Sequence, residues 1–192
     1  SNNSVNVINN NYGNRSIYDI RVILRTHIKT IIYDDIDLNR LMIDSLYEDD
    51  DNIANAIAYI NRDKLCFVDY KWYFFNDNVW AECNINTKII SKFVTLYDKI
   101  KKFIADSNEI YEVEKREYLD QINQIANDIK NAKKNKQIIL LLGEKLNKKN
   151  TFDTDTNIIA FNNGVYDFTK MTFRQTNTSD MIKMTCGYDF CS

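Results

Sequence analysis

The spacing of apolar residues switches between a helical and a strand-like period along this chain of 192 residues. Residues 17–33 place apolar side chains three or four positions apart, which is typical of one face of a helix. Residues 65–83 and 158–173 are strand-like instead, with many aromatic and β-branched side chains. The order helices, hairpin, helices, hairpin predicts an α+β fold that is predominantly helical with two short β-hairpins.

The segments between the strand-like parts carry helical patterns of their own. Asp37 and Asp51 stand where the N-caps of two short helices belong. The absence of proline and the low number of glycines, four, leave few sharp breaks in these elements. Helices are predicted from Thr87 onward and for residues 38–47, 52–61, 109–132 and 136–147. The apolar face of the helix from Thr87 holds Ile90, Phe93, Tyr97, Ile100 and Ile104, and that of the next holds Val113, Ile122, Ile125 and Ile129.

The two ends of the chain differ in composition. Residues 1–16 are polar and rich in asparagine, so we predict a flexible tail there. Residues 17–192 show neither an internal repeat nor a linker, and a single domain is expected. The hydrophobic share of the chain, 44%, is enough for the core of one domain of ordinary size.

Charge, cysteine and hydropathy patterns limit the class of protein. A net charge of −2 excludes a globally basic nucleic-acid binder but allows a local basic patch. The four cysteines form no C-x-x-C motif and the only histidine is His27, so a zinc site is poorly supplied and structural thiols are expected. No apolar run approaches the roughly 20 residues of a membrane span, and no signal peptide opens the sequence. These patterns predict a soluble intracellular protein in a reducing compartment.

Catalytic motifs are missing from the sequence. The stretch around Gly143 is nearest to a phosphate-binding loop, but it holds a single glycine and lacks the Gly-Lys pair with which this motif ends. G-x-S-x-G and H-E-x-x-H are absent, and His27 is interpreted as a helix residue rather than a catalytic base. We therefore predict no catalytic residue and no metal ligand. One alternative stays open: Asp35 and Asp37 either hold metal ions in a small nucleic-acid enzyme, or they cap and charge the next helix.

Charge is distributed unevenly along the chain. Residues 34–51 carry eight acidic side chains and one arginine, whereas residues 130–149 carry seven lysines and one glutamate. The lysines form a solvated helix face, follow a phosphate backbone, or meet the acidic pole of a neighbouring copy. The candidates for contact with DNA or a neighbouring subunit are Lys130, Lys133, Lys134, Lys136, Lys148 and Lys149.

Aromatic side chains of the first hairpin allow two interpretations. They either stack on nucleic-acid bases or pack into the core, and in a hairpin about half of them must face inward. The residues concerned are Trp72, Tyr73, Phe74, Phe75 and Trp80.

Two motifs in a fixed order connect this chain with a known family. An aromatic hairpin, W-Y-x-[FW]-x(3–4)-W, is matched by Trp72, Tyr73, Phe75 and Trp80. The pattern N-G-[VI]-[YFL]-D-[FL] and a later G-Y-D-[YF] are matched by residues 163–168 and 187–190, with Phe173 between them. Together they resemble the N-terminal-like (collar) domain that precedes the superfamily 3 helicase in poxvirus-type primase-helicases of large DNA viruses, phages and plasmids. The resemblance covers about residues 50–192. Its motif residues Trp72, Tyr73, Trp80, Asn163, Gly164, Asp167, Gly187 and Tyr188 are interpreted as structural.

The resemblance implies a non-catalytic domain of a viral replicative primase-helicase that supports ring assembly and DNA engagement during replication. The implied partners are neighbouring helicase subunits, in a hexamer of the parent protein, and single-stranded or forked DNA, without a membrane. ATP and Mg²⁺ are expected only in the helicase module, whose Walker motifs would lie beyond Ser192. The expected location is the host cytoplasm or a viral factory, and the richness in Asn, Ile and Lys suits a giant virus with an A/T-rich genome. The alternative is a protein–protein adaptor that recruits replication factors without contacting DNA.

The sequence Asn162-Asn163-Gly164 between two strand-like pieces also has a physical interpretation. Asn163-Gly164 predicts a bend at positive φ, since glycine lacks the Cβ atom that disfavours it. The asparagine side chains are expected to satisfy backbone groups at this bend.

Overall fold

The computed structural model describes residues 17–26, 34–47, 49–85, 87–149 and 152–191. The predicted tail at 1–16, His27 and the second half of the helix predicted for 17–33 lie outside the described residues. The described helices are α1 (Ile17–Thr26), α2 (Ile36–Asp44), α3 (Asp50–Asn61), α4 (Thr87–Val94), α5 (Tyr97–Asp106), α6 (Glu112–Ile129) and α7 (Ala132–Lys145), with short 3₁₀ turns at Ser45–Tyr47 and Thr178–Asp180.

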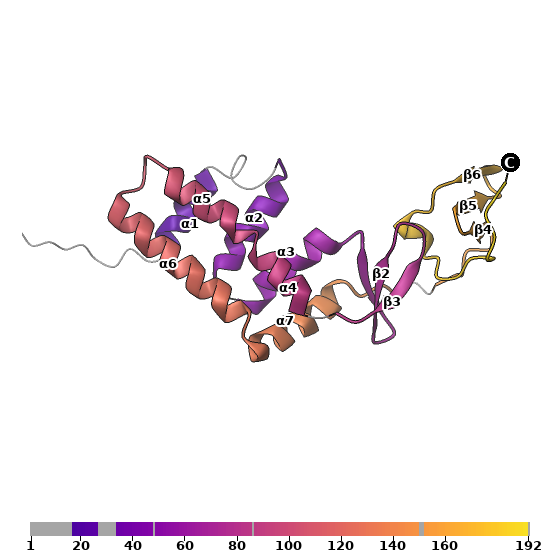
Figure 1. Ribbon diagram of the computed structural model, residues 1–192, viewed down its shortest axis with the longest axis horizontal. Coiled ribbons are helices and arrows are strands. Elements are labelled where there is room, and N and C mark those ends of the chain that lie inside the picture. The colour runs from indigo at the N-terminus through magenta and orange to yellow at the C-terminus, as the bar shows by residue number, and fades with distance from the viewer. Residues whose placement is uncertain (1–16, 27–33, 48, 86, 150–151, 192) are drawn as a thin grey trace, which may run out of the picture.

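Two small antiparallel sheets accompany the helices. Each is a three-stranded meander, so the predicted α+β class is confirmed and each predicted hairpin gains one strand. The strands are β1 (Leu65–Val68), β2 (Lys71–Phe75), β3 (Trp80–Cys83), β4 (Ile158–Phe161), β5 (Gly164–Asp167) and β6 (Thr172–Arg174). The helices lie at one end of an elongated molecule, β1–β3 lie in the middle, and β4–β6 lie at the other end (Figure 1).

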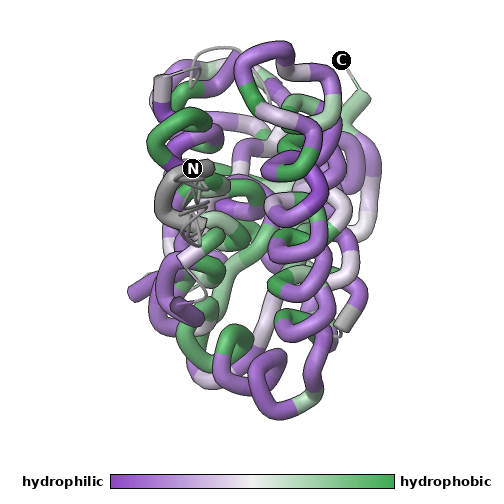
Figure 2. The backbone as a smooth tube through the Cα atoms, turned by 90° about the vertical axis from the view of Figure 1, so that its left-hand side faces the viewer, coloured by the Kyte–Doolittle hydropathy of each residue, from purple (hydrophilic) through white to green (hydrophobic). Residues whose placement is uncertain are grey.

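A core of apolar side chains holds the helical end together. Each of the seven described helices contributes buried residues to this core. The apolar face predicted from Thr87 is among them, with Ile90, Phe93, Tyr97, Ile100 and Ile104. Seen along the molecule from the helical end, hydrophobic segments turn towards the inside and hydrophilic ones towards the outside (Figure 2). A second, smaller core lies under β1–β3 and is made of Cys66, Val68, Tyr73, Phe75, Trp80 and Met181.

The predicted N-caps are wrong by two residues. Asp35 caps α2 by accepting a hydrogen bond from the Leu38 backbone N–H at 2.9 Å, and Asp49 caps α3 by accepting one from Asp51. Each cap has the extended backbone that this position requires, and the aspartates that follow lie within the first turn, where the helix dipole favours them.

The helix predicted from Thr87 is two helices. The chain tightens between α4 and α5, where the Leu96 N–H donates to the Phe93 carbonyl and the Asp98 N–H donates to the Thr95 carbonyl. The Thr95 hydroxyl donates to the Lys92 carbonyl, which draws this carbonyl into a local turn. The next helix differs from the prediction as well, since Val113 is 72% exposed and Tyr118 is buried instead.

Irregular segments run along the outer strands of both sheets. Beside β1, the Phe67 N–H donates to the Leu146 carbonyl and the Lys148 N–H donates to the Phe67 carbonyl, both at 3.0 Å. Beside β3, the Trp80 N–H donates to the Ile182 carbonyl, and beside β4 the Cys186 N–H donates to the Ala160 carbonyl. The first two bonds attach the end of α7 to β1, and the other two attach the C-terminal segment to β3 and β4.

Two further sequence-based expectations concern cysteines and membranes. In the described parts of the chain, no helix has both the length and the apolarity needed to cross a membrane. All four cysteines are free thiols. Cys66 is fully buried, and this burial raises the pKa of its thiol to about 11, which suits a structural thiol, whereas Cys186 and Cys191 are exposed.

Candidate functional site

Helix α7 presents the basic segment of the chain. Its N-cap is Asn131, whose side chain accepts a hydrogen bond from the Lys133 N–H at 3.0 Å. One face of the helix is buried and packs against α3. The 3.6-residue period turns the opposite face to solvent, and its exposed members are Lys133, Lys136, Gln137, Leu140 and Glu144.

Two lysines of the basic segment pair with acidic residues of the same chain. The Lys145 Nζ atom lies 2.6 Å from an Asp51 carboxylate oxygen, and the Lys134 Nζ atom lies 3.7 Å from one of Asp50. The hydrogen bond from Lys145 holds the pKa of Asp51 below its ordinary value. The acidic and basic segments therefore meet partly within one molecule, across the α3–α7 contact, and this occupies Lys134, one of the predicted contact residues.

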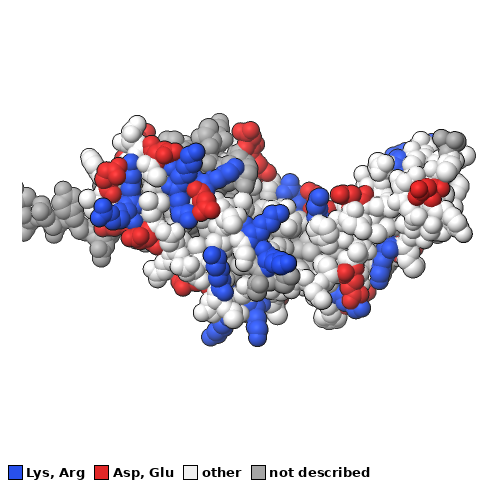
Figure 3. All heavy atoms as spheres, in the orientation of Figure 1, with Lys and Arg blue, Asp and Glu red and all other residues white. Residues whose placement is uncertain are grey.

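Four of the six predicted contact lysines are free to meet a ligand. Lys130, Lys133, Lys136 and Lys149 are exposed, and within the described ranges none of them makes an ion pair. Two adjoining hollows of ≈ 480 and ≈ 430 Å³ share Lys133 and Gln137 in their walls at the start of α7. Basic side chains project from the lower side of the molecule, where α7 lies in Figure 1 (Figure 3).

Lys148 is engaged in a different way. Its side chain is half-buried, and the Nζ atom lies 5.0 Å from the ring centroid of Trp80, within the range of a cation–π contact. Its backbone is held at the edge of β1. Lys148 therefore contributes to the packing between the end of α7 and the first sheet, and its ammonium group is less accessible to a ligand than those of the exposed lysines.

The aromatic side chains of the first sheet are mostly packed. Tyr73, Phe75 and Trp80 are at most 6% exposed, and the Trp80 Nε1–H donates to the Thr178 carbonyl at 3.1 Å. Trp72 packs against Phe67 with ring centroids 4.8 Å apart. These four rings pack inside the protein and are not placed for stacking on bases. Phe74, the fifth aromatic residue of this group, is 44% exposed.

The Asn162-Asn163 turn clamps the end of the described chain. Asn163 makes a pair of bonds with Phe190: its Oδ1 atom accepts from the Phe190 N–H at 2.9 Å, and its Nδ2 group donates to the Phe190 carbonyl at 3.1 Å. The Asn162 N–H donates to the Tyr188 carbonyl. The expected role of the asparagines is thus present. The positive φ, +152°, occurs at Gly164.

Asp167 belongs to an ionic cluster on one face of the second sheet. Its carboxylate accepts hydrogen bonds from the Thr169 and Lys170 N–H groups and lies 3.5 Å from the Arg174 Nε atom. The Arg174 guanidinium also forms a two-pronged contact with Asp180, at 2.7 and 2.9 Å. The motif residue Asp167 therefore closes the β5–β6 turn and holds the arginine.

The opposite face of β4–β6 is aromatic and only partly covered. We call it the aromatic face; Phe190 stacks on Phe173 there, with ring centroids 4.5 Å apart and an angle of 9°. Ile159 and Phe168 remain 43% and 46% exposed. The members of the aromatic face are Ile159, Phe161, Tyr166, Phe168, Phe173 and Phe190.

The metal-ion alternative for Asp35 and Asp37 gains no support from the geometry. The Asp35 carboxylate caps α2 and also accepts from the Tyr59 hydroxyl at 3.0 and 3.1 Å. Asp37 pairs with Arg40 at 3.3 Å on the surface. In the ranges that the structure describes, no three His, Cys, Asp or Glu side chains come together as a metal site.

Comparison with known families gives one match. The model of the family described as "D5 N terminal like" matches residues 54–192, close to the range in which the two sequence motifs occur. No curated protein matches the sequence. The match includes α7, both sheets and every motif residue named above, and it leaves out α1, α2 and the start of α3.

Proposed function

The chain belongs to the D5 N-terminal-like family, the N-terminal domain of D5-type primase-helicases of viruses and phages, and we propose that it holds DNA through the exposed lysines of α7. Membership of the family assigns the domain to a replication protein. The finer role, contact with the phosphate backbone, comes from the surface of this chain. The observation that carries it is the group of exposed lysines without an ion pair at the start of α7 and after its end.

The electrostatics of this surface favour a phosphate backbone. Lys130, Lys133 and Lys136 surround the N-terminal end of α7, where the helix dipole adds positive potential to that of the ammonium groups. Two acidic side chains line the same hollow: Asp50, which is paired with Lys134, and Asp128. Lys130, Lys133 and Lys136 make no ion pair within the described ranges, so their charge is available to an anion although the chain as a whole is slightly acidic.

Salt dependence of binding tests the proposal. If four lysines each replace a counterion on single-stranded DNA, raising the salt from about 50 to about 200 mM should weaken binding about 50-fold. Replacing Lys133 and Lys136 with glutamate should reduce this salt effect to about sevenfold and lower the affinity at low salt. Fluorescence anisotropy of labelled single-stranded and forked DNA measures both quantities.

Lys102→Glu is the matched control. Lys102 is also an exposed helix lysine, but it lies on α5 near Asp98 and Asp106, so its replacement should leave DNA binding unchanged. Absence of binding at tens of micromolar protein, or equal losses in the α7 and α5 variants, would contradict the proposal. The adaptor alternative would then account better for this domain.

The aromatic face favours a second function, contact between helicase subunits in a ring. An uncharged, half-exposed patch of stacked rings suits a protein neighbour better than a phosphate backbone. Phe168→Ser should weaken self-association about tenfold in sedimentation experiments over a concentration series, because a side chain at the exposed margin of this face is lost. Tyr111→Ser, at a 75% exposed residue of the helical end, should leave it unchanged. If Phe168→Ser and Tyr111→Ser associate equally strongly, the aromatic face is not the contact between subunits. ATP and Mg²⁺ belong, in this proposal, to the helicase part of the parent protein.

A further inference from the structure

The turn between β1 and β2 carries a tyrosine in an unusual place. Val68 and Lys71 are paired across the strands, so Asp69 and Tyr70 form a two-residue turn, and both have positive φ, +48° and +62°. Such turns strongly prefer Asn-Gly, because a side chain with a Cβ atom is strained at positive φ. The tyrosine is therefore an unfavourable choice for the fold itself.

Nothing within the described chain compensates for this choice. The Tyr70 side chain is 94% exposed, the highest exposure among the large apolar side chains that the structure describes, and it makes no hydrogen bond or ring contact there. A strained backbone that presents a bare aromatic ring is more often a feature of function than of stability.

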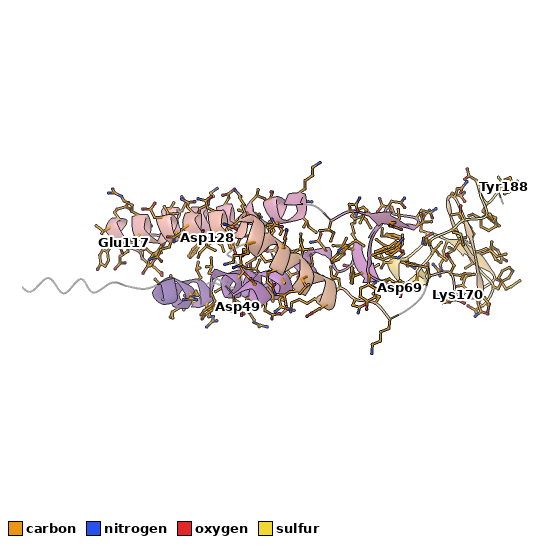
Figure 4. All side chains as sticks on the ribbon, turned by 90° about the horizontal axis from the view of Figure 1, so that it is seen from below. Asp49, Asp69, Glu117, Asp128, Lys170 and Tyr188 are labelled. Carbon is orange, nitrogen blue, oxygen red and sulfur yellow. The ribbon has the colours of Figure 1, made fainter. Side chains whose placement is uncertain are left out.

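The turn lies at the end of the lysine surface. After α7, the chain bonds to β1 at Phe67 and runs parallel to this strand, so Lys149 leaves the bridge in the direction of the turn. Seen from below, α7 runs from the neighbourhood of Asp128 towards β1–β3 and Asp69 (Figure 4). The turn therefore lies beyond the C-terminal end of α7, the helix that carries Lys133 and Lys136, and close to the segment that holds Lys149.

We propose that Tyr70 stacks on a base of single-stranded DNA whose phosphates are held by the lysines of α7. This inference rests on the proposed function and adds to it a preference for single strands over duplex, because only unpaired bases offer a free face to a ring. The acidic neighbour Asp69 is exposed to solvent, and Lys71, the first residue of β2, is paired with Glu82 at 3.0 Å. Stacking is tolerant of sequence, which suits a replication domain.

Two replacements of Tyr70 separate this role from a structural one. Tyr70→Gly should raise the melting temperature, because the strain at positive φ is relieved, and should weaken binding to a single-stranded oligo-dT about tenfold. Tyr70→Phe should keep the affinity, because the ring and not the hydroxyl is needed. Both variants should keep the salt dependence of the unmodified protein, because no charge is changed.

A strand with abasic positions provides the complementary control. On such a strand the unmodified protein should bind as weakly as Tyr70→Gly binds oligo-dT, and Tyr70→Gly should lose nothing further. Unchanged oligo-dT affinity in Tyr70→Gly, with the lysine variants still impaired, would overturn the stacking role alone and point to a protein contact at the turn. If the unmodified protein binds no DNA, or if the lysine variants bind normally, the proposed function fails as well.

Discussion

Gly164→Ala is expected to destabilise the protein by about 3 kcal/mol, the sum of a backbone and a packing penalty. Gly164 has a φ of +152°, which residues with a Cβ atom rarely adopt. A Cβ atom there would lie 2.5 Å from the Arg174 carbonyl oxygen and 2.7 Å from the Phe173 ring. Neither neighbour can move freely, because β5 and β6 are paired at Val165–Arg174 and Phe173 is stacked on Phe190.

Thermal unfolding followed by circular dichroism measures this effect. For a chain of this size, 3 kcal/mol corresponds to a fall of about 9 °C in the melting temperature. Gly187→Ala is the matched control: its φ of +84° is also positive, but no atom lies within 4 Å of the added Cβ. Only the backbone penalty remains, so a fall of about 3 °C is expected. Equal losses in the two variants would show that the close approach of Gly164 to β6 does not matter.

Arg174→Met is expected to cost about 3 kcal/mol at neutral pH, because it leaves two carboxylates without their counter-charge in a mostly buried setting. The side chains of Asp167 and Asp180 are 8% and 10% exposed, and that of Arg174 is 24% exposed. Chemical denaturation with urea measures the loss. Arg25→Met is the control, since its ion pair with Asp44 is 2.9 Å long but more exposed, and a cost below about 1 kcal/mol is expected.

The same replacement should change the response of stability to acid. Burial alone would raise the pKa of Asp180, but the hydrogen bonds from Arg174 and from the Asn177 N–H, together with the positive charge of Arg174, outweigh it and hold this pKa below its ordinary value. The pKa of Asp167 is lowered as well, first by the Thr169 hydroxyl and less by Arg174. A lowered folded-state pKa contributes stability above the unfolded pKa of about 4, and this stability is lost as pH falls through the folded value. The difference between Arg174→Met and the unmodified protein should therefore shrink below about pH 4, and a difference independent of pH would contradict the role of the ion pairs.

The sequence allowed the fold class and the family to be predicted, because both depend on patterns that span many residues. The apolar side chains from Ile90 to Ile104 are buried although the helix breaks at Thr95. The apolar faces of α4 and α5, before and after the break, both point towards the core. The N-caps were misplaced because each is one of several neighbouring aspartates, and only the backbone geometry selects Asp35 and Asp49. The first turn was missed because Asp69-Tyr70 lacks the usual turn residues.

The candidate site was predictable in part. The run of lysines is visible in the sequence. Which lysines form ion pairs with acidic residues and which stay exposed depends on the packing of α7 against α3, because only the lysines that face α3 can reach Asp50 and Asp51. The stacking role of Tyr70 could not be inferred from the sequence, because the neighbouring aromatic residues Tyr73, Phe75 and Trp80 are buried and only the turn geometry singles it out.

The irregular segments along the outer strands restrict how copies of this domain can join. Adding a strand from a second molecule requires an open row of backbone N–H and C=O groups, and such rows also invite aggregation. The rows of β1, β3 and β4 are occupied by residues near Leu146, Ile182 and Cys186, which leaves β6 as the open edge within the described sheets. Since β6 spans only Thr172–Arg174, subunits of a ring would meet through side chains and not through a shared sheet. In the ring proposed above, such contacts can break and form again without disturbing either sheet.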